Sequence, residues 1–160
     1  MRSPFATHVD GVDVTPEPPD RSERPYGAGR ATPQRQVIAS TAAARGGSFS
    51  VDELATDVCV RDPTIGAATV YRAVAAMLAS GWIERVGERH GSALFARCSE
   101  GGRHHHHLVC DRCGRVATTE CPLGDNTTSA AQRSGFVITR HEVTLYGLCP
   151  DCAPSARDEA

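Results

Sequence analysis

The stretch "TIGAATVYRAVAAMLASG" at residues 64–81 predicts a helix with two dissimilar faces. Apolar residues recur at the spacing of one helix face, and Gly81 ends the pattern. They are Val70, Val74, Met77 and Leu78. The other face is small and polar, with one arginine, and comprises Gly66, Thr69, Arg72 and Ala76. A face this slim fits a DNA major groove about 12 Å wide, where arginine reaches base edges or phosphate.

The segments on either side of this helix complete a pattern of three helices and a hairpin. Thr32 as N-cap and Pro33 at the first helical position start one helix, which ends at Gly46 or Gly47. A capping box from Ser50 to Glu53 starts a second helix. Residues 82–98, "WIERVGERHGSALFARC", predict two short strands joined near residues 89–91. The pattern indicates a winged helix-turn-helix, and another small α+β domain is the alternative.

From residue 108 onward the chain alternates short strands with one helix. "LVC" and "RVATTEC" flank a turn at residues 111–114, and residues 124–135 predict a weak helix. Residues 136–149 then predict a closing strand, because their apolar residues roughly alternate. This segment predicts a second, smaller α/β domain.

The expected fold class is therefore α+β, with a winged helix-turn-helix followed by a small α/β domain. We expect the DNA-binding domain at residues 30–98, a hinge at 99–103 and the α/β domain at 104–153. Residues 1–29 are rich in proline and acidic residues with few large apolar groups, which predicts a disordered arm. Residues 154–160 predict a disordered tail.

Composition and charge restrict the function classes. No apolar run approaches the roughly 20 residues of a membrane span, and the N-terminus has no secretory h-region. We therefore expect a soluble cytoplasmic protein without a membrane partner. The net charge of −2 alone would discourage nucleic-acid binding. The charge is uneven, however: residues 30–97 hold eight Arg against six acidic residues, which permits DNA binding.

Seven cysteines include two Cys-x-x-Cys pairs, Cys110 with Cys113 and Cys149 with Cys152. Without a secretory signal, this usage favours metal binding over disulfides. Two such pairs at tight turns can face one tetrahedral Zn²⁺, and a closed four-thiolate site is structural. The alternative, two thioredoxin-type redox pairs, needs a strand-to-helix setting that neither pair has.

Four consecutive histidines, residues 104–107, stand directly before the first cysteine pair. If this run is extended, alternate side chains point to opposite sides. His105 and His107 would then serve one site, and His104 and His106 another. The alternative is an unstructured metal-scavenging tract.

Four blocks together resemble the ferric uptake regulator family of metal-dependent repressors. They are "TPQR" (32–35), "ATVYRAV" (68–74), "HHHHLVCDRCG" (104–114) and "GFVITRHEVTLYGLCPDC" (135–152), in the family's order and spacing. The resemblance covers residues 30–152. It implies a homodimer, joined through the second domain, that binds AT-rich palindromic operator DNA when loaded with metal.

The resemblance also implies roles for individual residues. Tyr71 and Arg72 match DNA-contacting positions of the recognition helix, and we add Thr69 and Arg35 as candidate DNA contacts. For Tyr71 the alternative is a core aromatic residue. The four paired cysteines match the structural zinc site.

Two regulatory metal sites follow from the same resemblance. A hinge site maps to Glu84, Cys98, His105 and His107. A second site maps to His104, His106, His141 and an acidic residue, Asp125, with Glu120 as the alternative acid.

Two departures from the iron- and peroxide-sensing members bear on the metal. Phe49 stands where many of them have histidine, and Cys98 stands where iron sensors use glutamate. One carboxylate, one thiolate and two imidazoles suit Zn²⁺ better than Fe²⁺ or Mn²⁺, which indicates the zinc-uptake-regulator branch and control of zinc uptake genes. A buried structural Cys98 is the alternative.

The sequence leaves two alternative functions open and two cysteines without a ligand role. An iron- or peroxide-sensing member of the same family is the first alternative function. A zinc enzyme is the second, although the chain lacks His-Glu-x-x-His and a nucleophile placed near a base. Cys59 and Cys121 have no assigned ligand role and are interpreted as packing residues.

Overall fold

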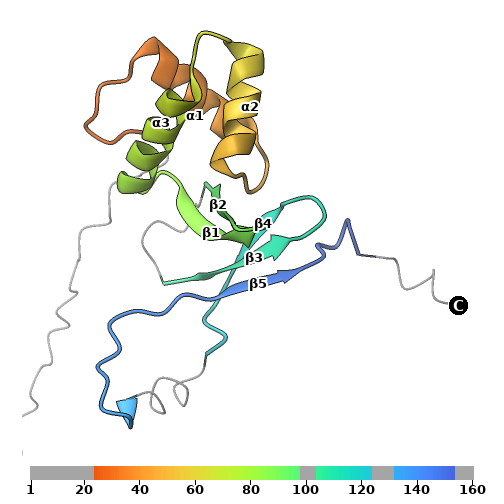
Figure 1. Ribbon diagram of the computed structural model, residues 1–160. Coiled ribbons are helices and arrows are strands. Elements are labelled where there is room, and N and C mark those ends of the chain that lie inside the picture. Colours follow the sequence, from red (N-terminus) through yellow and green to blue (C-terminus); the bar gives the residue numbers. More distant parts are fainter. Residues whose placement is uncertain (1–23, 98–103, 124–131, 154–160) are drawn as a thin grey trace, which may run out of the picture.

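The computed structural model describes residues 24–97, 104–123 and 132–153. Most of the predicted arm, the hinge, Cys98, the tail and most of the weak helix lie outside these residues. Three helices form one end of the described chain (Figure 1), and small sheets form the other. We call residues 24–97 the helical half, and residues 104–123 with 132–153 the sheet half. The α+β fold class is confirmed.

The helical half contains α1 (Pro33–Ala44), α2 (Val51–Arg61) and α3 (Ala67–Ala79). The predicted starts of α1 and α2 are confirmed. The N–H of Arg35 donates to Thr32 Oγ1 over 3.3 Å, with Pro33 in the first turn. Both hydrogen bonds of the capping box between Ser50 and Glu53 are present. Each cap satisfies a backbone group that the first turn leaves unpaired.

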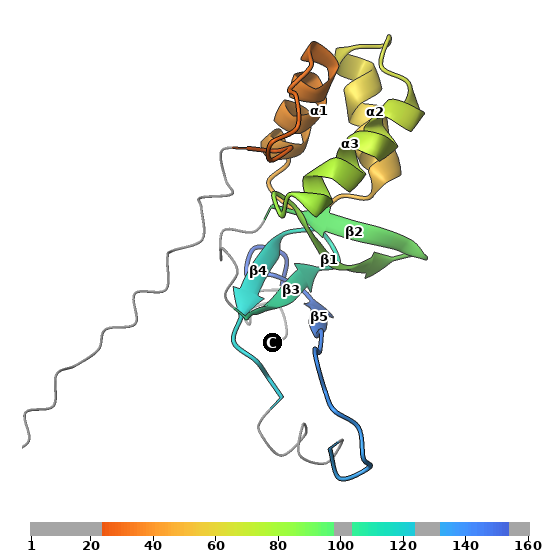
Figure 2. The ribbon, with the colours of Figure 1, turned by 90° about the vertical axis from the view of Figure 1, so that its left-hand side faces the viewer.

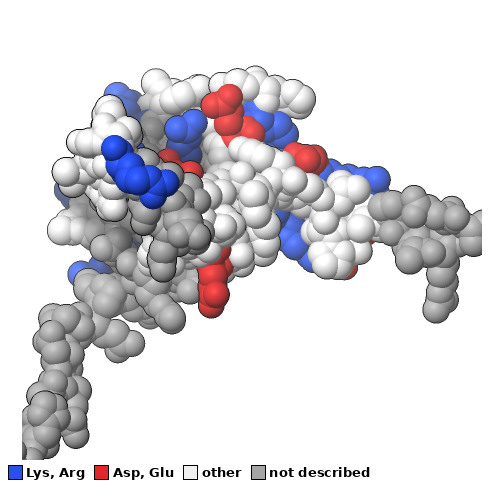
Figure 3. All heavy atoms as spheres, turned by 90° about the horizontal axis from the view of Figure 1, so that it is seen from below, with Lys and Arg blue, Asp and Glu red and all other residues white. Residues whose placement is uncertain are grey.

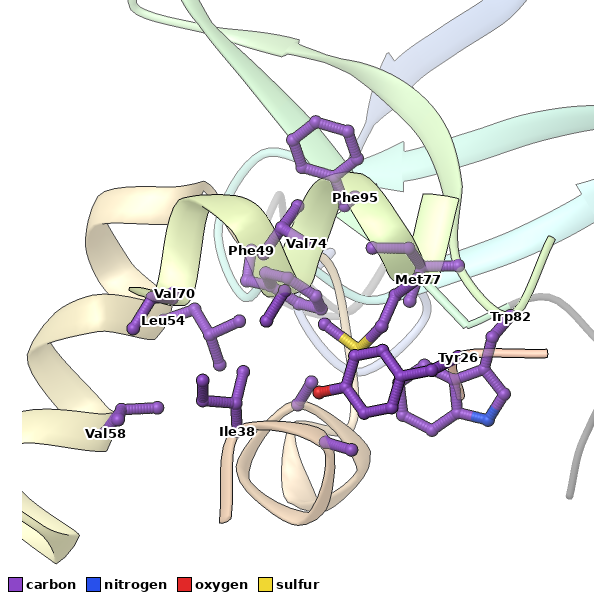
Figure 4. Packing of buried hydrophobic residues seen from close by; sticks show 14 of the residues in the cluster. Tyr26, Ile38, Phe49, Leu54, Val58, Val70, Val74, Met77, Trp82 and Phe95 are labelled. Atoms are coloured by element: carbon purple, nitrogen blue, oxygen red, sulfur yellow. The ribbon is translucent and has the colours of Figure 1, made fainter. Parts of the chain in front are cut away.

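A core of apolar side chains fills the space between the three helices and the hairpin (Figure 4). Val70, Val74 and Met77 of α3 are buried in it as predicted, but Leu78 is 42% exposed. The prediction that Leu78 belongs to this buried stripe is wrong. Leu78 follows Val70 by eight residues, which at 3.6 residues per turn places it about 80° around the helix axis from Val70. Leu78 therefore lies past the edge of the arc that Val70 and Met77 bury.

Tyr26, which the sequence analysis assigned to the N-terminal arm, packs into this core with 8% exposure. Its hydroxyl donates to the carbonyl of Arg35 over 2.7 Å. The Arg35 guanidinium lies 5.0 Å from the ring centroid. Burial raises the pKa of Tyr26 to about 12, so the phenol stays protonated as the donor. The chain ahead of α1 thus contributes to the core.

The hairpin consists of β1 (Glu84–Arg89) and β2 (Ser92–Ala96), paired antiparallel. His90 and Gly91 join them, and both have positive φ, 51° and 78°. Two such residues form the turn that matches the strand twist, and glycine adopts it without strain. Phe49 pairs with Phe95 and fastens the hairpin to the α1–α2 connection. The predicted wing is confirmed.

The second sheet has the order β4-β3-β5, with β3 (His106–Cys110) in the centre. β3 is antiparallel to β4 (Val116–Thr119) and parallel to β5 (Thr144–Gly147). The predicted strand over 136–149 is wrong for its first part, since residues 136–143 form no strand. The pairing of β3 with β5 begins with His107 opposite Thr144, so the residues before Thr144 are not paired with β3.

The hairpin of the helical half lies beside the second sheet (Figure 2), and hydrogen bonds join the two halves at two places. The Tyr146 hydroxyl accepts from the N–H of Glu88 over 2.7 Å, and Thr144 Oγ1 donates to the carbonyl of Val86 over 3.1 Å. On the other side, the N–H and the hydroxyl of Ser48 both donate to the carbonyl of Gly114, over 2.7 and 3.0 Å. These contacts set the orientation of the wing relative to β3.

Candidate metal centres and the exposed face of helix α3

Three groups of histidine, cysteine and acidic side chains lie within the described residues. In each group the candidate ligand atoms lie within 4.8 Å of one another. The thiol cluster consists of Cys110, Cys113, Cys149 and Cys152. The hinge cluster consists of Glu84, His105 and His107. The second cluster consists of His104, His106, Cys121 and His141.

The pleat of the chain at β3 separates the four histidines into two pairs. Extended backbone sends successive side chains to opposite faces. His105 and His107 accordingly face β1, and His104 and His106 face His141. The sequence predicted this alternation, and the ring centroids within each pair lie 4.9 Å and 4.7 Å apart.

The hinge cluster draws on both halves of the molecule. Glu84 is the first residue of β1, and its Oε2 lies 3.2 Å from His105 Nε2. The same oxygen lies 3.8 Å from His107 Nε2, which is too long for a hydrogen bond. Cys98, the fourth ligand that the sequence analysis assigned here, lies outside the described residues.

His107 carries the observation that points most directly to a metal ion. Its Nε2 is buried and has no hydrogen-bond partner among the described residues. A buried polar atom without a partner costs about 1–3 kcal/mol, so an unassigned ligand is the natural explanation. Burial lowers the pKa of His107, as does the neighbouring His105, while Glu84 opposes them. The lowered pKa favours the neutral imidazole, which is the form that binds metal.

The second cluster converges on His141. The Nε2 atoms of His104 and His106 each lie 3.2 Å from His141 Nε2, and Cys121 Sγ lies at the same distance. His106 is only 2% exposed, and burial, with the adjacent His104, lowers its pKa. The backbone N–H of Val143 donates to His106 Nδ1 over 3.1 Å.

Of the two acidic residues assigned to this second site, only Glu120 lies within the described residues. Asp125 lies outside the described residues, and Glu120 is exposed and absent from the group. Cys121, interpreted above as a packing residue, is half-buried and lies in the group. The antiparallel register pairs His106 with Thr119, so two further residues bring Cys121 opposite His104. Knowledge of that register would have identified Cys121.

Cys59 also differs from its sequence interpretation. It lies on the outer surface of α2 and is exposed, so it is not a packing residue.

The thiol cluster brings two turns together at the end of the second sheet. Cys113 Sγ lies 3.6 Å from Cys149 Sγ, and the N–H of Cys149 donates to Cys110 Sγ over 3.3 Å. Backbone N–H groups of Cys113 and Cys149 lower the pKa of Cys110 to about 6. Hydrogen bonds with the Cys149 and Cys113 thiols raise the pKa of Cys152 to about 12. The turns therefore already stabilise one thiolate, and four converging sulfurs fit a tetrahedral Zn²⁺.

The exposed face of α3 carries three of the four candidate DNA contacts. Arg72 is exposed, Thr69 is half-buried, and Arg72 Nη2 lies 3.4 Å from Thr69 Oγ1. Tyr71 is 50% exposed and donates to Asp52 Oδ1 over 2.6 Å, so the alternative of a core aromatic is wrong. Arg35 is half-buried: it stacks on Tyr26 and donates to the carbonyl of Arg30 over 3.1 Å.

The surface of the molecule seen from below differs from the exposed face of α3 in its distribution of charge. Basic and acidic side chains form separate small groups there on a largely uncharged surface (Figure 3). Apolar side chains of the sheet half are exposed, among them Leu108, Leu145 and Leu148 at 39%, 43% and 46%.

Among the described residues, no helix is long and apolar enough to span a membrane.

Comparison with known proteins gives consistent matches. The sequence profile of the "Ferric uptake regulator family" matches residues 27–146. The "Zinc uptake regulation protein" of Mycobacterium tuberculosis is 35% identical over 128 residues, which cover 77% of this chain and 94% of that protein. The "Transcriptional regulator FurA" of Mycobacterium bovis is 33% identical over 94 residues, 58% of this chain. The match spans only 63% of the length of that FurA.

Solved structures with similar folds point the same way. A structure described as "Zinc Uptake Regulator Complexed With Zinc AND DNA" has a TM-score of 0.61 and 27% identity, covering 76% of this chain and 82% of that one. A "zinc-bound manganese uptake regulator" has a TM-score of 0.52 and 30% identity, covering 76% and 91%. Both TM-scores lie above 0.5, in agreement with a shared fold.

Proposed function

This chain belongs to the ferric uptake regulator family, and on that basis we propose that it is a zinc-dependent repressor of zinc uptake genes. The family consists of metal-dependent transcriptional regulators rather than enzymes, so the zinc-enzyme alternative is set aside. The proposed repressor binds AT-rich palindromic operator DNA as a homodimer in the cytoplasm. Its cofactor is Zn²⁺ at both structural and regulatory sites.

The observation that carries this proposal is the position of the hinge cluster across the two halves. Glu84 belongs to the wing, and His105 and His107 belong to the central strand of the other sheet or directly precede it. An ion held by all three binds best at one relative orientation of the halves. Binding then shifts the population toward that orientation, because a ligand favours the state that it binds more tightly.

Cys98 is the fourth ligand in this proposal. β2 ends at Ala96, which is paired with Glu84, so the chain leaves the hairpin beside the carboxylate. A carboxylate, a thiolate and two imidazoles form a set that suits tetrahedral Zn²⁺. Fe²⁺ and Mn²⁺ prefer sites with more oxygen ligands. The relatives include zinc, iron and peroxide regulators, and this ligand set favours zinc.

The thiol cluster serves as the structural zinc site in this proposal. An ion there holds the turn between β3 and β4, whose Gly114 carbonyl accepts the two hydrogen bonds from Ser48. The structural site thus supports the second contact between the halves.

DNA contact falls to the exposed face of α3, where Arg72 and Tyr71 project. Arg72 reaches base edges or phosphate, and Thr69 supports its guanidinium. Tyr71 is held by Asp52, which positions its ring at the edge of the same face. Arg35 lies at the start of α1, where a phosphate contact would compete with its hydrogen bond to Arg30.

The homodimer is proposed to form through the sheet half. β5 is an edge strand, and exposed edges of β-sheets tend to be covered. Leu145 and Leu148 add exposed apolar surface on or beside this strand, of the kind that marks protein–protein contacts.

A metal-buffered DNA-binding titration tests the proposal. Under reducing conditions, Zn²⁺, Fe²⁺, Mn²⁺ and Ni²⁺ are compared for their effect on binding to AT-rich palindromic DNA and to a scrambled duplex. We expect Zn²⁺ alone to give tight, specific binding at buffered concentrations, with Cys59→Ser behaving like the parent. Activation by Fe²⁺ or Mn²⁺ in preference to Zn²⁺ would favour the iron- or peroxide-sensing alternative instead. DNA affinity that ignores every metal would contradict the proposal.

A further inference from the structure

We infer that Cys121, and not a carboxylate, is the fourth ligand of the second cluster, which makes this a site of three imidazoles and one thiolate. For its regulatory meaning, the inference rests on the proposed zinc-dependent function. Its chemical content concerns only residues of the sheet half, and it is testable without DNA. The observations concern the position of the thiol, the crowding at His141 and the nature of the donor atoms.

The position of Cys121 follows from strand pairing rather than from a chance approach of a surface thiol. β4 runs antiparallel to β3, and the chain leaves it at Thr119, opposite the buried His106. Cys121 is half-buried at this exit, and its thiol donates to the carbonyl of Leu123 over 3.3 Å. Cys59, exposed on α2, has no such surroundings.

The crowding at His141 calls for a cation. A neutral imidazole nitrogen offers either one proton or one lone pair. His141 Nε2 nevertheless has three polar neighbours at 3.2 Å, namely two Nε2 atoms and one sulfur. A single proton or lone pair satisfies at most one of these contacts at a time. An ion placed among the four atoms satisfies all of their lone pairs together.

His106 shows what metal binding has to change in this cluster. Because Val143 N–H donates to its Nδ1, the proton of the neutral ring lies on Nε2, toward His141. Coordination through Nε2 requires that proton to leave this nitrogen. Nδ1 would then carry the ring proton and could no longer accept from the N–H of Val143. Metal binding at the second cluster would thereby be coupled to the backbone just before β5.

The donor set favours a soft or borderline cation. A thiolate with three imidazoles gives tetrahedral coordination to Zn²⁺, and Co²⁺ is its spectroscopic substitute. Iron and manganese sites prefer carboxylate oxygen, which the described cluster lacks. Cys121 therefore supplies selectivity for zinc at the second site, as Cys98 is proposed to do at the hinge site.

The second cluster also differs from the hinge cluster in what it connects. His104 precedes β3, His106 is its first residue, Cys121 follows β4 and His141 precedes β5, so all four belong to the sheet half. Glu84 of the wing is not among them. An ion there would hold these strand ends together. It would not contact the wing, which contributes Glu84 to the hinge cluster instead.

Cobalt substitution tests the assignment. The protein carries Cys98→Ser, which removes the proposed hinge thiolate, and zinc is retained in the thiol cluster while exchangeable metal is removed with a chelator. On titration with Co²⁺ we expect a sulfur-to-cobalt charge-transfer band that an added Cys121→Ser abolishes. Added Cys59→Ser and Asp125→Asn are expected to leave the band unchanged. Zinc release is measured in parallel, so that exchange in the thiol cluster is recognised.

Two spectroscopic results would overturn the inference. One is a charge-transfer band that persists in the variant lacking both Cys98 and Cys121, with no zinc released. The other is loss of this band on Asp125→Asn. A Cys121→Asp variant that keeps the visible cobalt bands without the charge-transfer band supports the inference, because it shows an intact cluster with an oxygen ligand in place of sulfur.

Thiol alkylation gives a second test on the otherwise unmodified chain. Iodoacetamide labelling of Cys121 is followed by peptide mass spectrometry with and without Zn²⁺. We expect zinc to slow labelling of Cys121 at least tenfold in the parent and to have no such effect in His141→Ala. Cys59 serves as the internal control and reacts equally in all samples. Equal labelling of Cys121 with and without zinc would contradict the inference.

These results separate the inference from the proposed function. Loss of the cobalt band in Cys121→Ser supports the ligand assignment even if DNA binding never responds to zinc. Conversely, zinc-dependent DNA binding with an unchanged cobalt band supports the repressor proposal and refutes the ligand assignment.

Discussion

The helical half and the sheet half are held together by different chemistry. Fifteen buried residues form the core cluster of the helical half, which the hairpin completes. The other cluster has four buried residues, Val86, Leu94, Ala96 and Val109, and only Val109 comes from the sheet half. Eleven His, Cys and acidic residues make up the three clusters among the described residues, and all except Glu84 lie in the sheet half. We therefore expect the sheet half to depend on metal ligation for its structure.

The largest expected effect follows from removing the proposed structural ion or one of the four cysteines of the thiol cluster. Cys113→Ser, or removal of zinc by a strong chelator, should abolish the hydrogen-exchange protection of β3 and β4 while α1 to α3 stay protected. The reason is that structural zinc contributes about 10–16 kcal/mol in small zinc domains, far more than Val109 can replace. Hydrogen exchange by mass spectrometry makes the measurement, with Cys59→Ser as the control. Equal loss of protection in both halves would show that the comparison is wrong.

The second prediction concerns a substitution in the core of the helical half rather than in a metal cluster. Leu54 is fully buried, so Leu54→Ala should destabilise the helical half by about 2–5 kcal/mol. Zinc content should stay at the parental value, because the thiol cluster lies in the other half. Denaturant unfolding followed by circular dichroism, with zinc analysis of the same sample, checks both points. Substitution of the exposed Val60 by alanine is the matched control, with little change expected. Loss of zinc in Leu54→Ala would mean that the halves fold as one unit.

The hinge cluster tests how the halves communicate. His107→Ala removes the buried imidazole and should reduce the zinc response of DNA binding by about 5–150-fold, the usual range of coupling free energies of 1–3 kcal/mol. DNA affinity is measured by fluorescence anisotropy at fixed buffered zinc. His90→Ala, in the exposed wing turn, is the control histidine. A full zinc response in His107→Ala would refute the role of the hinge cluster.

The smallest expected effect concerns the hydrogen bond between Tyr146 and the wing. Tyr146→Phe removes the acceptor for the N–H of Glu88 and should cost about 0.5–1.5 kcal/mol. Hydrogen exchange at Glu88 should accelerate while the core of the helical half is unaffected. Tyr71→Phe, which removes a hydroxyl far from this contact, is the control. Unchanged exchange at Glu88 would show that this contact does not help to orient the wing.

The features that the sequence predicted are local ones. The N-cap at Thr32, the capping box at Ser50 and the turn at His90 and Gly91 each depend on neighbouring residues along the chain. The alternation of the four histidines is likewise a property of extended backbone. These patterns were sufficient for α1, α2 and α3, for the wing and for the grouping of the four cysteines.

The features that the sequence did not predict depend on distant pairing. Cys121 joins the second cluster only because β4 returns along β3 in one particular register. Residues 136–143 alternate like a strand, yet no strand pairs with them among the described residues. Leu78 has the spacing of a buried residue, but the burial of α3 ends before it. Each of these outcomes depends on contacts between residues that are distant in the sequence, which no local sequence pattern specifies.

The close approach of Gly87 to Tyr146 limits which side chains can occupy these two positions. A methyl group at that position would lie 2.4 Å from the Tyr146 hydroxyl, so any larger side chain there displaces the phenol. Among related sequences, the loss of this glycine should accompany a smaller residue at position 146. The two positions are expected to covary although they lie far apart in the sequence.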